Sequence, residues 1–243
     1  ILTCDKPVIN RVNGMRVGGG QEIGMACDYS IASDMARFGQ AGPKHGSAPD
    51  GGSTDFLHLY VGIGRAIESC TLCKHWSAMQ AVDYGLINKM VPVLKNKSGK
   101  FVQSPFVYID GCDEFGNPQM GAFKTGKDLE EAKRATEECT IDLSLLDSAV
   151  NQMAFDLALT MPDCLSKTLE SLRKKKLEHW YQNSETNRSW LALNMMTEAK
   201  AGFRAFNEGP KNNREVDFLK LRQLLAQATP WTDDLISQVM PKR

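Results

Sequence analysis

Near its beginning the chain reads Gly18-Gly19-Gly20-Gln21-Glu22-Ile23-Gly24-Met25-Ala26-Cys27. This stretch is the strongest indicator of the fold, because the alternating residues 7–14 before it predict a strand and residues 21–27 predict a short apolar helix. Glycines between a strand and a helix lack Cβ atoms, so the backbone can approach a ligand closely with its N–H groups pointing outward. At a helix N-terminus these donors and the helix dipole favour negative charge.

Three anion-binding uses of such a glycine turn can be compared with the spacing found here. A P-loop would require GxxxxGK followed by Ser or Thr, which is absent. A dinucleotide fingerprint would require GxGxxG, which the spacing of the glycines at 18, 19, 20 and 24 does not fit. The third anion is an oxyanion that develops only in a transition state. On the glycines alone, we favour the simpler interpretation of a tight turn that packs a helix on a strand.

Two carboxylates lie close to glycines and have two interpretations each. Glu22 would complement the dipole of the helix that it begins, or act as a general acid or base in a closed pocket. Asp50, in the glycine-rich loop 47–54, would form an Asx-type turn or helix cap, or provide a second functional carboxylate. His45 on the same loop is a weaker candidate base, because a lone histidine is more often a structural hydrogen-bonding residue.

Outward from this stretch the pattern changes twice. Residues 29–33 and 36–39 predict short strands, 42–54 a loop, residues from about 56 and after Ser77 helices, and 86–92 a strand. Residues 95–127 are irregular, and a loop of this length inside a domain is often functional. From Asp128 the spacing of apolar residues predicts helices to the end. We therefore expect an α/β part at residues 1–94, an insertion at 95–127 and a helical region at 128–243.

The composition excludes several classes of function. The chain has 243 residues, of which 42% are apolar and 24% charged, as in ordinary globular proteins. Lys+Arg and Asp+Glu number 29 each, so the basic excess typical of a nucleic-acid binder is absent. No apolar run approaches the roughly 18 residues of a membrane span, and the N-terminal residues do not form a signal peptide. They look like the middle of a protein, so we expect the chain to be a fragment.

The cysteines and the basic and aromatic residues have structural interpretations. Seven cysteines without a secretory signal indicate free thiols in a reducing compartment, and we expect a cytoplasmic protein. Cys70 and Cys73 form a CxxC pair without a second ligand pair, so we expect small core residues and no metal. The basic run at residues 173–176 predicts a solvated helical face rather than an anion site. Three aromatic residues at helical spacing are expected in core or subunit contacts: Trp180, Tyr181 and Trp190.

Many separate motifs match one known family in order. They are Lys6-Pro7-Val8-Ile9, Val12-Asn13-Gly14, Gly18-Gly19-Gly20-Gln21-Glu22, Cys27-Asp28, Ala36-Arg37-Phe38-Gly39-Gln40, Asp50-Gly51-Gly52 and Gly85-Leu86-Ile87-Asn88. The chain resembles the crotonase (enoyl-CoA hydratase/isomerase) superfamily. The resemblance implies an α/β fold with a ββα superhelix core, N-terminally truncated here, and a C-terminal helical region for trimerisation and active-site closure.

The resemblance also implies a CoA thioester substrate whose carbonyl oxygen is held by two backbone N–H groups. Gly19 matches the second of these donors, flanked by Gly18 and Gly20 at the substrate, and the first donor would precede this chain. Glu22 matches the first of the two glutamates of hydratases. Gly42 takes the place of the second glutamate.

The segments Gly42-Pro43-Lys44 and Asp50-Gly51-Gly52 are instead similar to the 1,4-dihydroxy-2-naphthoyl-CoA synthase branch. In that branch bicarbonate can occupy the space at the glycine, and the aspartate takes part in proton transfer. The resemblance therefore makes Asp50 the first catalytic candidate with Glu22 as its partner and His45 as a weaker one. It places Gly42 and Gly51 at the substrate.

Taken over the whole chain, the sequence resembles a ring-opening branch that hydrolyses a carbon–carbon bond of a cyclic ketonic acyl-CoA in anaerobic aromatic degradation. The alternatives are a synthase-like lyase, an enoyl-CoA hydratase and a non-catalytic acyl-CoA-binding subunit. The resemblance further implies no metal or redox cofactor, with bicarbonate near Gly42 as an option. It implies no nucleic-acid or membrane partner, and a homotrimer or a dimer of trimers.

Overall fold

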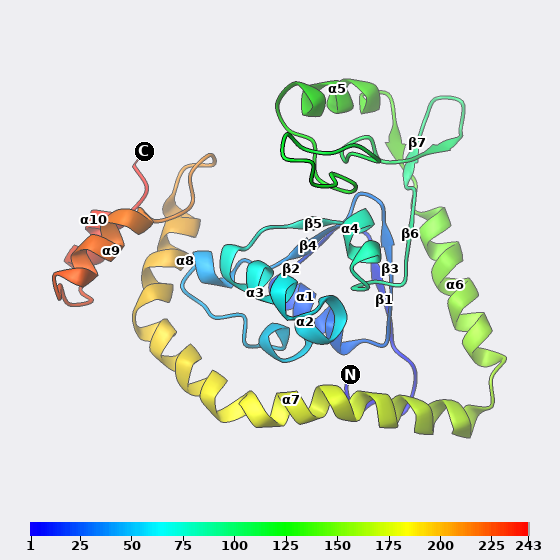
Figure 1. Ribbon diagram of the computed structural model, residues 1–243, viewed down its shortest axis with the longest axis horizontal. Helices are drawn as coiled ribbons and strands as arrows, with labels where there is room; N and C mark the ends of the chain where they lie inside the picture. Colours follow the sequence, from blue (N-terminus) through cyan, green and yellow to red (C-terminus); the bar gives the residue numbers. More distant parts are fainter. Residues whose placement is uncertain (243) are drawn as a thin grey trace.

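Two small sheets form the centre of the structure, a computed structural model that describes residues 1–242 (Figure 1). Their strands are β1 (Ile9–Val12), β2 (Met15–Val17), β3 (Tyr29–Ser33), β4 (Arg37–Gly39), β5 (Trp76–Ser77) and β6 (Lys89–Val91). One sheet has the order β1-β3-β6 with parallel neighbours. The other has the order β2-β4-β5, with β2 parallel to β4 and β5 antiparallel. The first four strands thus alternate between the sheets, and the strands predicted at 29–33 and 36–39 are confirmed.

Four helices cover this centre: α1 (Gly19–Ala26), α2 (Ser53–Val61), α3 (Ile63–Leu72) and α4 (Ala78–Asp83). Ser77 caps α4 as predicted, because its hydroxyl accepts from the Gln80 backbone while the Gln80 side chain accepts from the Ser77 backbone. Gly85 follows with a φ of 79°, the left-handed conformation that a glycine adopts without strain. Among the largest fully buried core side chains are Phe38 and Phe56. These helices and strands form the buried core on which the glycine turn lies.

The irregular segment contains little regular structure of its own. Strands β7 (Leu94–Lys95), β8 (Phe101–Val102) and β9 (Thr140–Ile141) make a third sheet in the order β8-β7-β9, and α5 (Gly126–Thr136) precedes β9. The prediction of helices without interruption after Asp128 is therefore wrong at β9. Two residues are too short to show a period-2 pattern, and β9 forms because β7 offers it an antiparallel partner.

The rest of the chain is helical and surrounds the α/β part (Figure 1). It comprises α6 (Ser144–Ala158), α7 (Pro162–Met196), α8 (Glu198–Glu208), α9 (Phe218–Ala226) and α10 (Asp233–Val239). Helix α6 packs on the first sheet through Leu146, which is fully buried against Ile31 and Val91. Helices α8, α9 and α10 form a separate apolar cluster around Ala205 and Leu235. Between these two groups the 35-residue α7 passes beneath α1 and α2.

Two basic residues fasten α7 to the α/β part. Arg173 is buried, forms an ion pair with Asp28 and donates to the backbone carbonyls of Cys4 and Lys6. The Nζ of Lys176 donates to the carbonyls of Met25 and Cys27 at the end of α1, at 2.8 and 2.9 Å. The prediction of a solvated face is wrong for these two positions. One face of α7 lies on α1, where charged groups require partners because water is excluded.

The three aromatic residues of α7 differ in burial. The Trp180 ring stacks on Phe56, with ring centroids 6.0 Å apart, which confirms the predicted core contact. Tyr181 and Trp190 are 66% and 57% exposed. Cys73, which ends α3, is buried and Cys70 is half-buried, and both are free thiols as predicted. None of the helices within residues 1–242 combines the length and the apolar character needed to cross a bilayer.

Candidate active site

The glycine turn leaves the beginning of α1 open. Gly18 has a φ of 58°, which favours glycine, and its N–H donates to the carbonyl of Gly39 at 3.0 Å. A Cβ atom at position 18, 19 or 20 would meet no atom within 4 Å, so the space directly beside all three glycines is free. The first N–H groups of a helix have no acceptor within the helix. Those of Gly19 and Gly20 are therefore available to a negatively charged oxygen in this space.

Glu22 lies on the first turn of α1 and contacts the loop before α2. Its Oε1 accepts from the Gly51 N–H at 3.1 Å. A Cβ atom at Gly51 would overlap the Glu22 carboxylate, so this contact depends on the glycine. Burial raises the pKa of Glu22, and the neighbouring charge of Asp50 also raises it, against hydrogen bonds from Ser53 and Gly51. Glu22 is thereby poised to exchange protons closer to neutral pH than an exposed glutamate.

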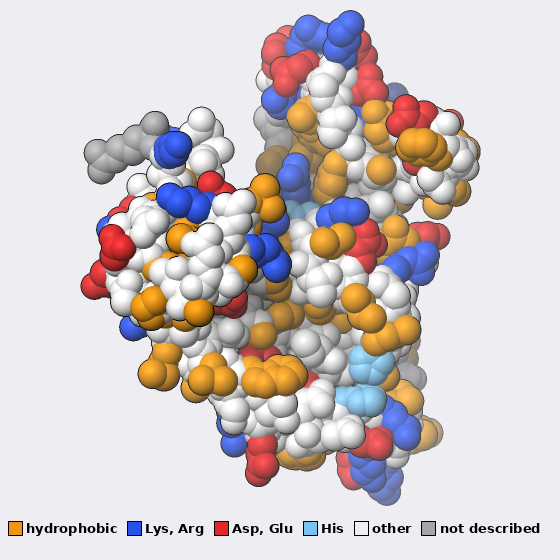
Figure 2. Space-filling model, turned by 60° about the vertical axis from the view of Figure 1, so that its left-hand side comes forward, with side chains coloured by type: hydrophobic (Ala, Val, Ile, Leu, Met, Phe, Trp, Pro, Cys, Tyr) orange, Lys and Arg blue, Asp and Glu red, His pale blue; other side chains and the backbone are white. Residues whose placement is uncertain are grey.

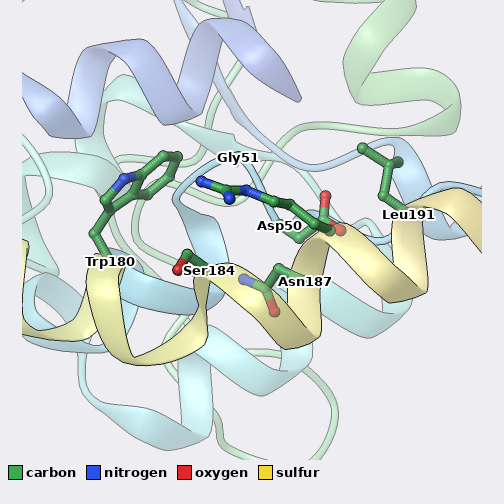
Figure 3. A pocket seen from close by; sticks show the side chains of 7 residues that line it. Asp50, Gly51, Trp180, Ser184, Asn187 and Leu191 are labelled. Atoms are coloured by element: carbon green, nitrogen blue, oxygen red, sulfur yellow. The ribbon is translucent and has the colours of Figure 1, made fainter.

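Asp50 adjoins this contact from the other side. Its Oδ2 atom is buried and has no hydrogen-bond partner among residues 1–242. Burial raises the pKa of Asp50 as well. Asp50 and Gly51 line a cavity of about 230 Å³ (Figure 3). The other lining residues come from α7: Trp180, Ser184, Asn187, Arg188 and Leu191.

A second cavity shares Gly51 and Trp180 with the first. It has a volume of about 350 Å³, and Glu22, Ile23 and Tyr181 contribute to its wall. The structure thus brings Glu22, Gly51 and Asp50 together between two hollows. This arrangement allows two carboxyl groups with raised pKa values to serve one bound molecule, one as an acid and the other as a base.

Helix α7 is held over this site by two polar contacts. The Asn183 amide donates to Asp55 Oδ1 at 2.7 Å, and the Asn187 amide donates to Thr54 Oγ1 at 3.4 Å. The resemblance implied that the C-terminal helical region closes the site, but the sequence pointed to no individual residue of α7 there. The four-residue spacing of Ser184 and Arg188 indicates a shared polar face. No pattern in the sequence says which distant loop that face contacts.

The other predicted residues lie against different neighbours. Gly42 begins a short 3-10 helix (Gly42–Lys44), and a Cβ atom there would overlap the carbonyl oxygen of Ser47. The His45 ring makes an edge contact with Phe206 at a centroid distance of 5.0 Å, and its backbone touches Gly202 of α8. Burial lowers the pKa of His45. Neither cavity is lined by His45 or Gly42.

A buried cation beneath α1 has no local signal in the sequence. Arg16 is 3% exposed, and its Nε donates to Gln21 Oε1 at 2.8 Å. Its Nη1 donates to Asn10 and Ser30, and no carboxylate within residues 1–242 forms an ion pair with it. Burial lowers its pKa to about 10, which leaves it charged at neutral pH. Gly24 makes room for this side chain, because a Cβ atom there would overlap the guanidinium. The cation adds positive potential beneath the helix that carries the glycine turn.

Comparisons with known proteins agree with this geometry. The profile of the family described as "Enoyl-CoA hydratase/isomerase" matches residues 1–102. Over these residues the chain matches that family, the crotonase superfamily. The predicted resemblance and α/β fold class are thus confirmed. The glycine turn, Glu22 and Asp50 all fall within the matched residues.

Three curated relatives carry the name "6-oxocyclohex-1-ene-1-carbonyl-CoA hydrolase". The protein of Geobacter metallireducens is 57% identical over 99% of this chain and that of Thauera aromatica 55% identical over 99%. The protein of Syntrophus aciditrophicus is 43% identical over 100% of it. The chain spans only 64% of the length of the first two relatives and 65% of the third.

Solved structures of the family show the same fold. An enoyl-CoA hydratase from Mycobacterium avium subsp. paratuberculosis K-10 superposes with a TM-score of 0.61 at 20% identity, over 86% of this chain and 65% of that one. A carnitinyl-CoA dehydratase from Mycobacterium avium 104 gives 0.55 at 22% identity, over 83% and 61%. At this identity the likeness concerns the fold and not the reaction.

Proposed function

We propose that the protein containing this chain is a ring-opening hydrolase that acts on 6-oxocyclohex-1-ene-1-carbonyl-CoA. The observation that carries the proposal is the placement of Asp50, which lines a cavity next to Gly51 and has one carboxyl oxygen without a partner. Gly51 in turn donates to Glu22 on the first turn of α1. The names of the relatives at 57% and 55% identity support the choice of substrate.

The first step of the proposed reaction is the addition of water to the ring double bond. This bond is conjugated with the thioester, so attack by water moves an electron pair onto the thioester oxygen. The Gly19 N–H group would hold that oxygen, and one such donor is worth about 2.7–4 kcal/mol of transition-state stabilisation. Asp50 takes the proton of the attacking water, and the α-carbon then receives a proton, which completes the hydration.

The second step breaks a carbon–carbon bond. A second water attacks the ring ketone, its proton passes to a carboxylate, and the bond to the thioester α-carbon breaks. The electron pair returns to the thioester oxygen as an enolate, so the Gly19 donor serves both steps. Protonation of the α-carbon gives 3-hydroxypimeloyl-CoA. The reaction consumes two waters and needs no oxidant or reductant.

The coupling of the two carboxyl groups suits this sequence of proton transfers. Burial raises the pKa of both groups, and the charge of Asp50 adds a smaller upward effect on Glu22. With Asp50 ionised and Glu22 protonated, the pair holds a base for water and an acid for the α-carbon at the same time. We assign the base to Asp50, because its Oδ2 has no competing donor.

Other features of the proposal concern the whole protein. It acts in anaerobic benzoyl-CoA degradation in the cytoplasm, and it requires no metal or redox cofactor. Bicarbonate beside Gly42 stays a prediction, and the dependence of the rate on added bicarbonate tests it. The Ser47 carbonyl oxygen occupies the position that a Cβ atom of residue 42 would take. It assembles as a homotrimer or a dimer of trimers. Exposed hydrophobic side chains on the C-terminal helices support assembly (Figure 2), Trp190, Met196 and Phe203 among them.

The test is product analysis with the full-length protein and its Asp50→Asn variant. With 6-oxocyclohex-1-ene-1-carbonyl-CoA we expect 3-hydroxypimeloyl-CoA from the wild type. The variant should retain its affinity for the thioester, and its turnover should fall by about 100-fold or more, as for loss of a general base. A wild type that hydrates crotonyl-CoA but leaves the cyclic ketone intact would instead be an enoyl-CoA hydratase. Binding without any turnover would indicate the non-catalytic subunit, and unchanged turnover of the variant would exclude Asp50 from the mechanism.

A further inference from the structure

We propose that Arg188 is a second anion-binding residue of this site, which binds the ring-ketone oxygen as it becomes an oxyanion and then the carboxylate that the cleavage creates. The inference rests on the proposed function and deepens it. It gives α7 a role that matters most in the cleavage step.

Arg188 lies at the same cavity as Asp50. It lines the cavity of about 230 Å³ that Asp50 also lines, together with Ser184 and Asn187 from the same face of α7. Figure 3 shows Asp50 on the loop and the polar side chains of Ser184 and Asn187 on the helix beside it. A molecule positioned for proton transfer to Asp50 therefore lies within the same hollow as the guanidinium.

The other Lys and Arg side chains of α7 all have acceptors. Lys167, Lys174 and Lys175 each pair with a carboxylate on their own helix. Arg173 pairs with Asp28, and Lys176 donates to two backbone carbonyls. Across the described residues, 1–242, no hydrogen bond or ion pair engages Arg188. It is the α7 cation that lacks an acceptor in this part of the chain.

The state of Asp50 is consistent with a free guanidinium. An ion pair between the two residues would lower the pKa of Asp50, whereas burial raises it and no cation opposes that effect. Asp50 therefore remains able to accept and release protons, and Arg188 remains available to a third group. Guanidinium donors match a carboxylate in two parallel hydrogen bonds, so the natural third group is a carboxylate or its precursor.

The proposed cleavage supplies such a group. Water attacks the ketone carbon, its proton goes to Asp50, and the ketone oxygen becomes an oxyanion. When the carbon–carbon bond breaks, the oxyanion re-forms a carbonyl and the electron pair leaves to the thioester enolate. The new carboxylic acid then loses its proton and becomes a carboxylate. The Gly19 donor serves the thioester oxygen, so the charge on the other side of the breaking bond requires its own partner. Hydration places only part of its enolate charge on the ketone oxygen, because that carbonyl and the thioester are both conjugated with the double bond. In the cleavage step the ketone oxygen carries the full charge of a tetrahedral oxyanion.

The experiment compares Arg188→Met, Arg188→Lys and the matched control Lys174→Met, which removes an exposed α7 cation. Mass spectrometry follows the hydrated ring and the ring-opened acid separately in the full-length protein. For Arg188→Met we expect ring opening lower by about 100-fold, as for removal of one oxyanion donor, and a smaller loss of hydration, in which the ketone oxygen carries only part of the charge. The hydrated ring should accumulate, Arg188→Lys should restore part of the opening, and Lys174→Met should behave as wild type.

A binding measurement tests the residue without turnover. Pimeloyl-CoA ends in a carboxylate, and heptanoyl-CoA has the same length and ends in a methyl group. Calorimetry should show wild type binding pimeloyl-CoA about tenfold more tightly, a preference of about 1.4 kcal/mol that Arg188→Met abolishes and Lys174→Met keeps.

Two results would overturn the assignment. One is ring opening by Arg188→Met at the wild-type ratio to hydration. The other is an equal loss of both steps and of affinity for both thioesters, which would mean that Arg188 binds the CoA moiety or supports the fold. A wild type that prefers pimeloyl-CoA through Arg188 but opens no ring would retain the anion site and refute the proposed function instead.

Discussion

Replacing Arg173 by methionine should destabilise the protein strongly, although the residue lies within a run of basic residues on a long helix. The side chains of Arg173 and Asp28 are 4% and 6% exposed, so the substitution leaves a carboxylate in a nearly dry environment. Breaking a buried ion pair by removing one partner costs about 3–5 kcal/mol. The Val8 N–H still donates to Asp28 at 2.7 Å, and the carbonyls of Cys4 and Lys6 lose a donor.

These opposing effects place the expected loss in the lower part of the range, at about 3–4 kcal/mol in the free energy of unfolding. For a chain of this size, each kcal/mol corresponds to about 2–4 °C, so the Tm should fall by about 6–16 °C. Urea denaturation and thermal unfolding of the full-length protein measure both quantities.

The matched control is Lys174→Met, one position along the same helix. Lys174 pairs with Glu170 at 3.3 Å, with both side chains about two-thirds exposed, and such surface pairs contribute about 0–1 kcal/mol. Adding Asp28→Asn to Arg173→Met should recover part of the loss, because it removes the unpaired charge. Equal stability of the Arg173 and Lys174 variants, or strictly additive losses in the double variant, would refute the view that this pair fastens α7.

Three further variants test the site and its support. Asp50→Asn should be more stable than wild type at about pH 8, because burial raises the pKa of Asp50 in the folded state above its value in the unfolded state. The wild type therefore has its full stability below the unfolded-state pKa of Asp50 and loses part of it as the pH rises through the folded-state pKa. Urea midpoints should show this gain shrinking toward about pH 4, and a gain independent of pH would contradict it. Gly51→Ala should lower kcat by about tenfold or more, because its Cβ displaces the Glu22 carboxylate, whereas Gly64→Ala meets no atom within 4 Å and should leave kcat unchanged. Arg16→Lys should cost about 2 kcal/mol of stability, because an ammonium cannot reproduce the fork of donors to Gln21, Asn10 and Ser30; a loss below about 0.5 kcal/mol in urea denaturation would contradict this.

The local parts of the fold could be predicted because their signals are local. The glycine turn, the strand at residues 29–33 and the cap at Ser77 each depend on residues within one short segment. The pairing of Glu22 with the Asp50 loop came from the family resemblance, and the structure places the two carboxyl groups close enough for their charges to interact.

The tertiary parts could not be predicted in the same way. Arg173 and Lys176 have the same pattern as Lys174 and Lys175, and only the packing of α7 on α1 separates buried from exposed positions. The contact between Asn187 and Thr54 joins residues 133 apart in the chain. Arg16 looks like an exposed strand residue until Gly24, eight positions later, provides the space for its guanidinium. In each case the partner lies outside the window in which a periodic pattern can be recognised.

The most direct test of the proposed reaction is mass spectrometry of the products formed by the full-length protein from 6-oxocyclohex-1-ene-1-carbonyl-CoA in oxygen-18 water. We expect ring-opened 3-hydroxypimeloyl-CoA that carries label from two waters, one in the hydroxyl group and one in the new carboxylate. A singly labelled product with an intact ring, or no reaction at all, would contradict it.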